Sequence, residues 1–240
     1  MSDQPSLEIK TVMAIYAHPD DPEFFSGGLL AKWGMAGKRL IYVLATSGDK
    51  GTDDPTMTAD QLTALREAEQ RAAAACAGDS TVIFLRYGDG TLAHTLDLRR
   101  DLTRVIRQHR PDVVITNDPA TYYFKNGGIN HPDHMAIGAA ALAAVYPSAR
   151  DRHTFEELWR NEGLEPHKVR QVYLSGTWHP THKINITDVF ERKIAAINEH
   201  HSQVKDPEGL LSRMRGSFEP DFGETEPIYV ENYRVITLRV

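Results

Sequence analysis

Short apolar segments alternate with helical patterns along the first half of the chain. Four of these segments have the length of buried strands, namely TVMAIYA, RLIYVLAT, TVIFLRY and PDVVITN. Helical patterns separate them, the first at about residues 23–36. Such alternation is typical of parallel strands joined by helical crossovers. We therefore predict an α/β fold, a Rossmann-like three-layer αβα arrangement around a mostly parallel sheet.

The second and third predicted helices carry signals at their ends. Thr58 and Gln61 form a capping-box pattern before a periodic apolar segment, and Gly78 follows as a stop. The third helix has an apolar stripe within residues 98–106. Pro111 disfavours helix at the residue before it, so the strand VVIT is expected to follow directly.

The second half of the chain is less regular. We predict a short helix at 154–161, strands in VRQVYLSGT and KINIT, a helix at 188–201 and a last strand, YRVITLRV, that closes the sheet. Residues 206–227 are rich in glycine, proline and charge, and they exceed the usual length of a connection. We expect this segment to be a loop that acts as a lid or folds over the site.

Length and composition indicate one soluble domain. A chain of 240 residues suits a single domain, 1–240, and 41% hydrophobic and 25% charged residues are ordinary for a globular protein. The formal charge of -6 argues against a nucleic-acid partner. MSDQPSLEIK lacks the features of a signal peptide, and no apolar run approaches the roughly 20 residues of a membrane span. We therefore expect a cytoplasmic protein with no membrane partner, and a homo-oligomer stays open.

The end of the first strand carries the first candidate chemistry. AIYAHPDDPEF places His18, Asp20 and Asp21 at the carboxyl end of that strand, where open α/β sheets hold their ligands. Asp20 and Asp21 repel each other unless a cation or hydrogen-bond donors neutralise them. A divalent metal ion is the simplest neutralising group.

A second polar cluster follows the fourth strand. NHPDHMAIG places His131, Asp133 and His134 just before an alanine-rich helix, and therefore at the same edge of the sheet. Two histidines and one aspartate make an open three-ligand site of the kind that catalytic zinc uses. A single such tripeptide would be read as a turn with a capping aspartate, but two at the ends of two parallel strands favour a site. Because three imidazoles and three carboxylates are present, some have other roles.

Three motifs occur together in this chain: AHPDDPE, RxxE on the helix between the two clusters, and HPDH. YGDG, HHSQ and YVENYRVI extend the combination. The combination resembles the PIG-L/LmbE-like N-acetylglucosaminyl deacetylase family over nearly the whole chain. The resemblance implies a zinc-dependent N-deacetylase that acts on an N-acetylated small molecule, with ferrous iron as the alternative metal.

The resemblance also implies residue roles. The metal ligands would be His18, Asp21 and His134. Asp20 would be the general base. His131, oriented by Asp133, would face the tetrahedral oxyanion in its protonated form.

Three further residues are candidates for binding substrate. Arg66 is expected to bind a sugar hydroxyl or phosphate or to complete the site, and the alternative is a solvated helix face. Glu23 and His200 are the other candidates, although Pro22 interrupts the HPDDE pattern of many family members.

Aromatic residues in the second half offer surfaces for a sugar ring. We single out Trp159, Trp178 and the segment 214–222. The identity of the sugar is not encoded in these motifs.

Several other functions are open on the residues alone. A metal-dependent amidase could act on a thiol-sugar conjugate or another non-sugar amide. Two histidines and a carboxylate also bind iron in oxygenases, but those enzymes use a β-barrel that is not predicted here. A non-enzymatic Rossmann-like ligand-binding protein is the alternative from a different class, and no GxGxxG or GxxxxGK[ST] motif supports it. No GxSxG motif indicates a serine hydrolase.

Overall fold

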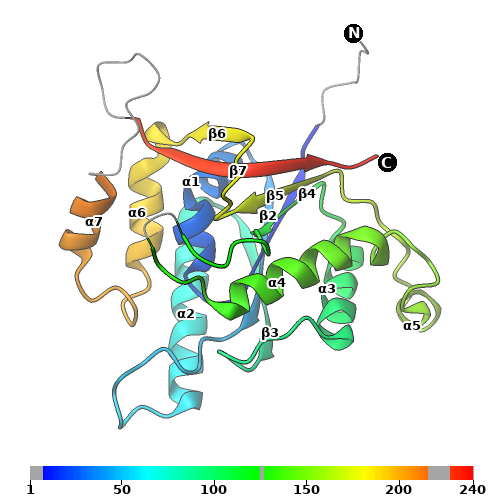
Figure 1. Cartoon of the computed structure of the whole chain (residues 1–240), viewed down its shortest axis with the longest axis horizontal. Coiled ribbons are helices and arrows are strands. Elements are labelled where there is room, and N and C mark those ends of the chain that lie inside the picture. The colour runs from blue at the N-terminus through cyan, green and yellow to red at the C-terminus, as the bar shows by residue number, and fades with distance from the viewer. Residues whose placement is uncertain (1–7, 125–126, 216–227, 240) are drawn as a thin grey trace.

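The computed structural model describes residues 8–124, 127–215 and 228–239 (Figure 1). The strands are β1 (Thr11–Tyr16), β2 (Arg39–Thr46), β3 (Ser80–Tyr87), β4 (Val113–Asn117), β5 (Gln171–Ser175), β6 (His182–Asn185) and β7 (Val230–Thr237). The α-helices are α1 (Asp21–Met35), α2 (Ala59–Ala77), α3 (Leu96–His109), α4 (Pro132–Ala143), α5 (Glu156–Arg160), α6 (Phe190–Asn198) and α7 (Pro207–Arg215). A π-helical turn follows α4 at Ala144–Ser148, and a 3-10 turn precedes α6 at Thr187–Val189.

The strands form one sheet in the order β3-β2-β1-β4-β5-β7-β6. Neighbouring strands from β3 to β5 are parallel, and β7 is antiparallel to both β5 and β6. The chain builds outward from β1 in one direction through β2 and β3, and in the other direction through β4 and β5. The carboxyl ends of β1 and β4 therefore flank a topological switch point, where open α/β sheets bind their ligands.

Helices cover both faces of the sheet, as Figure 1 shows. α1, α2 and α6 pack together on one face, and α3 and α4 pack on the other. Successive side chains of β1 alternate between the two cores: Val12 and Ala14 pack toward α1 and α2, while Met13 and Ile15 pack toward α3 and α4. Because both faces are covered, the parallel strands are apolar at nearly every position. This arrangement confirms the predicted three-layer α/β fold.

Local signals mark where the helices α2 and α4 begin. Thr58 Oγ1 accepts a hydrogen bond from the Gln61 amide at 3.3 Å, and Gln61 Oε1 accepts one from the Thr58 amide at 2.9 Å. α4 starts at Pro132, whose fixed φ suits a first helical turn. Gly138 lets α4 approach β4 closely, because a Cβ there would lie 2.3 Å from the Asn117 carbonyl oxygen. The HPDH segment is thereby held against the end of β4.

Two expectations for the second half of the chain are corrected. The last strand, β7, does not lie at the edge of the sheet but between β5 and β6. The segment predicted as a loop at 206–227 contains α7 at Pro207–Arg215, and residues 216–227 lie outside the described residues. Among the described residues, no helix combines the length and the apolar character needed to cross a bilayer.

Candidate metal centre and active site

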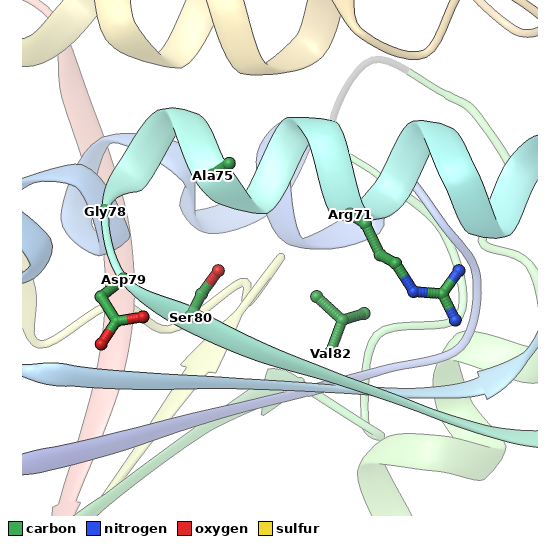
Figure 2. Close-up of a pocket in the computed structure, with 6 residues that line it drawn as sticks. All are labelled: Arg71, Ala75, Gly78, Asp79, Ser80 and Val82. Atoms are coloured by element: carbon green, nitrogen blue, oxygen red, sulfur yellow. The ribbon is translucent and has the colours of Figure 1, made fainter.

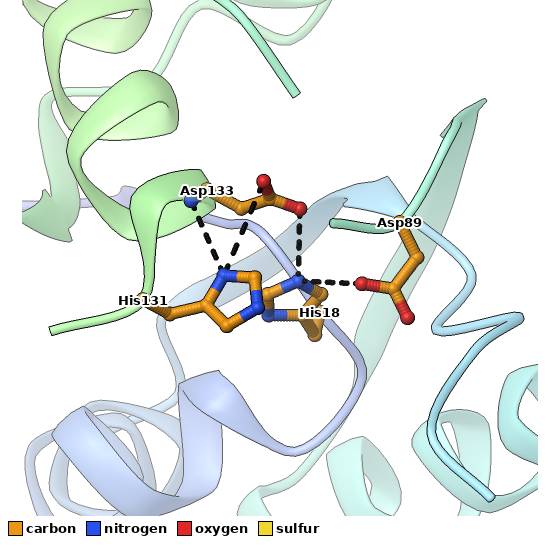
Figure 3. A group of neighbouring side chains, drawn as sticks. All are labelled: His18, Asp89, His131 and Asp133. Carbon is orange, nitrogen blue, oxygen red and sulfur yellow. Dashed lines mark hydrogen bonds and ion pairs between the residues drawn. The ribbon is translucent and has the colours of Figure 1, made fainter. Parts of the chain in front are cut away.

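The two predicted clusters meet at the switch point of the sheet. His18, Asp20 and Asp21 lie where β1 leads into α1, and His131, Asp133 and His134 lie where the chain enters α4. Figure 3 shows that His18 and His131 lie side by side, with Asp133 at the start of α4 above them. The expectation that both motifs share one edge of the sheet is therefore confirmed.

His18 is the centre of the cluster. Its Nδ1 lies 3.3 Å from Asp21 Oδ2. Its Nε2 lies 3.1 Å from Asp89 Oδ1 and 3.2 Å from Asp133 Oδ2, two contacts that Figure 3 draws. Burial opposes the charged ring, but the carboxylates of Asp133, Asp21 and Asp89 raise the pKa of His18 to about 12. The surroundings of the ring therefore strongly favour a positive charge, either on the ring or beside it.

Asp21 joins His18 to His134. Asp21 Oδ1 lies 3.0 Å from His134 Nε2, and the other ring nitrogen of His134 lies 3.0 Å from Asn130 Oδ1. Burial works to raise the pKa of Asp21, but the two neighbouring imidazoles, His134 first, lower it overall. Ligand atoms of His18, Asp21 and His134 all lie within 4.8 Å of one another.

This donor set fits a divalent metal ion. Each imidazole presents one nitrogen toward Asp21 and has the other beside an oxygen, which is the outer-shell arrangement that fixes metal-binding histidines. A second group, His18, Asp89, His131 and Asp133, also lies within 4.8 Å. There, however, both oxygens of Asp133 already accept backbone hydrogen bonds, from Gly90 and Leu92. The group with Asp21 is therefore the better candidate.

Asp89 was not among the residues predicted from the sequence. It belongs to the YGDG segment, which follows β3 and so ends at the same edge of the sheet. The His18 ring lowers the pKa of Asp89 to about 2, so the carboxylate is ionised. Its position after a parallel strand was the signal that could have identified it.

His131 is held differently from the prediction. Its Nδ1 accepts a hydrogen bond from the Asp133 backbone amide at 3.2 Å, whereas the Asp133 carboxylate is 4.0 Å away and faces His18. Burial, followed by the charge on His18, lowers the pKa of His131. With Nδ1 as acceptor, the neutral ring carries its proton on Nε2. The side chain is 42% exposed and can reach a bound molecule.

Asp20 occupies a strained position beside the metal-ligand group. Its φ of 97° is rare for a residue with a side chain. The Gln70 side chain accepts from its amide at 3.0 Å, and Arg66 Nη2 donates to its carboxylate at 3.1 Å. Burial and the negative charge of Asp21 raise the pKa of Asp20 to about 7. This value suits a group that both accepts and releases a proton near neutral pH.

Arg66 is buried beside Asp20 and does not lie on a solvated helix face. The residue is 4% exposed. Besides Asp20, its guanidinium donates to the carbonyl oxygens of Gly48 at 3.1 Å and Pro19 at 2.6 Å. Arg66 therefore fixes the turn that carries Asp20.

Glu23 and His200 are not placed to contact a substrate. Their side chains are 2% and 0% exposed, and they pair with each other at 3.1 Å. Gln70 donates to the other oxygen of Glu23 at 2.9 Å, and burial raises the pKa of Glu23. The prediction of direct substrate contacts is corrected accordingly: the pair supports Gln70, which holds Asp20.

A cavity of about 330 Å³ lies elsewhere, between α2 and β3. Figure 2 shows Arg71 and Asp79 at opposite ends of its lining. Arg71 already pairs with Glu67 at 3.3 Å and stacks over the Phe84 ring at 4.9 Å. Asp79 is the one carboxylate among the lining residues, and no imidazole joins it, so the lining does not assemble a group that could hold a metal.

Comparisons with known proteins place this chain in a family. Residues 13–145 match the model of the PIG-L family, described as GlcNAc-PI de-N-acetylase. Diacetylchitobiose deacetylase of Thermococcus kodakarensis is 32% identical over 200 residues, which cover 83% of this chain and 72% of the relative. The 1D-myo-inositol 2-acetamido-2-deoxy-alpha-D-glucopyranoside deacetylase of Rhodococcus erythropolis is 31% identical over 224 residues, covering 83% and 69%.

A solved structure extends the similarity to the fold. N,N'-diacetylchitobiose deacetylase from Pyrococcus horikoshii, complexed with its inhibitor MPG, matches with a TM-score of 0.84 at 30% identity. The match covers 96% of this chain and 85% of the relative.

Proposed function

Because this chain belongs to the PIG-L family, we propose that it is a metal-dependent hydrolase that removes the N-acetyl group from a small molecule containing N-acetylglucosamine. The convergence of His18, Asp21 and His134 beside Asp20 carries the proposal. We propose that residues 1–240 act as one cytoplasmic domain.

The three ligands favour zinc, with ferrous iron as the alternative, because imidazole and carboxylate suit both ions. A bound divalent metal would polarise the amide oxygen and lower the pKa of water. Asp89, Asp133 and Asn130 would keep the two imidazoles in the orientation that binding requires.

Asp20 supplies the proton transfers of the hydrolysis. Its carboxylate takes a proton as the oxygen of water attacks the amide carbon, and it returns that proton to the nitrogen as the C–N bond breaks. Acetate and a free amine are the products. Arg66 holds Asp20 in place for both transfers.

His131 is positioned to donate a hydrogen bond to the oxyanion. Its Nδ1 is occupied by the Asp133 amide, which directs the Nε2 proton outward. The neutral ring suffices for this role, so the protonated form expected from the sequence is not required.

Acetate release from N-acetylated sugars tests the proposal. Purified protein is expected to release acetate, to lose most of this activity after chelation, and to regain it with zinc or ferrous iron. Protein treated identically but without chelator is the control. Absence of release from every N-acetylated sugar tried, with metal bound, would overturn the sugar deacetylase and favour a non-sugar amide.

Gly48→Ala is expected to lower turnover about 10²-fold, because small displacements of catalytic groups have effects of that size. A Cβ added at Gly48 would lie 2.2 Å from Arg66 Nη1, the nitrogen that donates a hydrogen bond to the Gly48 carbonyl oxygen. Gly37→Ala is the matched control, since Gly37 has φ +69°, close to the +66° of Gly48, but nothing within 4 Å of the added atom. Similar urea midpoints in the two variants, with lower turnover in Gly48→Ala than in Gly37→Ala, would support the role of Arg66 in holding Asp20. Equal turnover in the two variants would refute that role.

A further inference from the structure

A short segment after α6 contacts three of the elements that surround Asp20. This HHSQ segment, residues 200–203, follows α6, a helix that packs on both α1 and α2. Its side chains bond to Glu23 of α1, to Glu69 of α2 and to Gly51 in the loop after β2. The segment therefore lies against the proposed active site, although none of its residues belongs to the metal-ligand group.

The backbone of Asp20 depends on its surroundings. Its φ of 97° and ψ of -33° are rare for a residue with a side chain, and strained conformations persist where neighbouring groups fix them. The Gln70 side chain accepts a hydrogen bond from the Asp20 amide. Arg66 donates to the Asp20 carboxylate and to the carbonyl of the preceding residue, Pro19. Because Arg66 and Gln70 are four residues apart, both lie on one face of α2.

His200 is connected to the Asp20 amide through two buried residues. Its Nε2 lies 3.1 Å from Glu23 Oε2, and Gln70 Nε2 donates to Glu23 Oε1 at 2.9 Å. Because a carboxylate holds the NH2 group of Gln70, the oxygen of that side chain is directed toward Asp20. His200 Nδ1 is buried and has no hydrogen-bond partner in the part of the chain that the structure describes. The contact with Glu23 is therefore the polar link of the His200 ring.

Gln203 is connected to the Asp20 carboxylate by a second route. Its Nε2 donates to the Gly51 carbonyl at 3.0 Å. Gly51 lies between two side chains, since a Cβ there would be 3.1 Å from Gln203 Oε1 and 2.5 Å from Arg66 Nη1. The Gly48 carbonyl accepts from that same Nη1 at 3.1 Å and from the Gly51 amide at 3.3 Å, which closes a turn. Gln203 therefore holds this turn against the guanidinium group that bonds to Asp20.

Ser202 anchors the segment between these two routes. Its amide and its hydroxyl group donate to the two carboxylate oxygens of Glu69, at 2.7 and 2.6 Å. Gln203 Nε2 also donates to Ser202 Oγ at 3.0 Å. Glu69 is 6% exposed and directly precedes Gln70 on α2. Both routes to Asp20 therefore start from a fixed point.

We propose that the HHSQ segment positions Asp20, the proposed general base. His200 acts on the Asp20 backbone and Gln203 on the Asp20 carboxylate. Both are positioning residues, since each acts through other side chains. The inference rests on the proposed function and adds a requirement to it: turnover depends on a segment outside the two motifs that supply the metal ligands.

A double-mutant cycle with Asp20→Asn tests the inference, with kcat and KM measured for an N-acetylated sugar that the metal-loaded protein turns over. His200→Leu is expected to lower kcat about 10-fold and to leave KM and the metal-to-protein ratio unchanged, because it displaces the base alone. In Asp20→Asn the same change should alter kcat by less than about twofold, since the group that it positions no longer transfers a proton. His200→Gln should recover most of kcat, because its side-chain nitrogen can donate to Glu23.

His167→Leu is the matched control for the loss of an imidazole. The His167 ring donates to the Pro111 carbonyl at 2.7 Å, before β4 and so at the opposite edge of the sheet, and kcat should be unchanged in this variant. An equal fall in kcat when His200→Leu is made with and without Asp20→Asn would overturn the inference. Loss of metal from His200→Leu would also overturn it, because the segment would then support the metal centre.

Gln203→Ala tests the second route, and it decides the question if His200→Leu does not fold. It is expected to lower kcat about 5-fold with KM unchanged, and to have no further effect in Asp20→Asn. Gln171→Ala is its control, since Gln171 bonds to Thr237 at 3.3 Å at the start of β5. Equal kcat in the two glutamine variants would overturn the second route.

Hydrogen exchange of the Asp20 amide, followed by NMR, measures the support of Asp20 without turnover. Exchange is expected to be about 10-fold faster in His200→Leu, because the Gln70 oxygen is no longer directed toward this amide, and unchanged in His167→Leu. Unchanged exchange in His200→Leu would overturn the inference even if kcat falls. Faster exchange, in a protein that releases no acetate from any N-acetylated sugar, would overturn only the proposed function.

Discussion

Asp20→Asn is expected to lower turnover about 10³-fold while leaving the bound metal unchanged. The amide has nearly the shape of the carboxylate and can still accept the hydrogen bond from Arg66, but it cannot take a proton from water. Asp20 is also not among the three residues of the metal-ligand group. The measurements are kcat for acetate release and the metal-to-protein ratio after dialysis.

Asp21→Asn provides the contrasting variant. Asp21 is the carboxylate between His18 and His134, so its replacement should lower the affinity for the metal ion, and turnover should fall because the protein has lost its metal. Glu67→Gln is the matched control for loss of a buried carboxylate that pairs with arginine, since Glu67 contacts Arg86 and Arg71 outside the site. Full turnover in Asp20→Asn, or equal loss of metal in Asp20→Asn and Asp21→Asn, would contradict the division of roles.

The sequence predicted the site because position and chemistry coincide. HPDD and HPDH each follow a buried parallel strand, and the carboxyl ends of such strands meet at one edge of the sheet. The periodicity of the residues that form α2, with the capping box, predicted the helix that carries Arg66, but left open whether Arg66 faces the site or the solvent. Patterns that depend on neighbours in sequence were therefore sufficient for the fold class and for placing the two polar clusters at one edge of the sheet.

The roles of buried polar residues could not be predicted in the same way. Glu23 is two residues from Asp21 and was expected to face the substrate, yet its side chain is 2% exposed and bonds to His200. Their contact joins positions 177 residues apart in the sequence, which no local pattern encodes. The position of β7 inside the sheet has a similar origin, because it depends on pairing with both β5 and β6.

The position of β7 brings a buried carboxylate into the middle of α1. Glu231 accepts hydrogen bonds from the amides of Gly28 at 2.8 Å and Leu29 at 2.9 Å, and pairs with Lys193 Nζ at 2.6 Å. Lys193 also donates to the Phe24 carbonyl at 2.9 Å, a group that the Gly28 amide would bond in a regular helix. The charged pair therefore bonds main-chain groups in the middle of α1 that would otherwise bond within the helix. Because α1 begins at Asp21, the pair helps to position the proposed metal centre.

Glu231→Ala is expected to lower the free energy of unfolding by about 3–5 kcal/mol, because it leaves the Lys193 ammonium group buried without its partner and removes the acceptor of two helix amides. Asp188→Ala is the matched control: Lys32 of α1 pairs with Asp188 at 2.6 Å, but Asp188 is 64% exposed, and its loss should cost less than about 1 kcal/mol. Urea denaturation measures both. Glu231→Gln combined with Lys193→Met removes both charges and keeps an acceptor, so it should recover much of the stability. Equal shifts in Glu231→Ala and Asp188→Ala would show that the buried pair does not hold α1 in place.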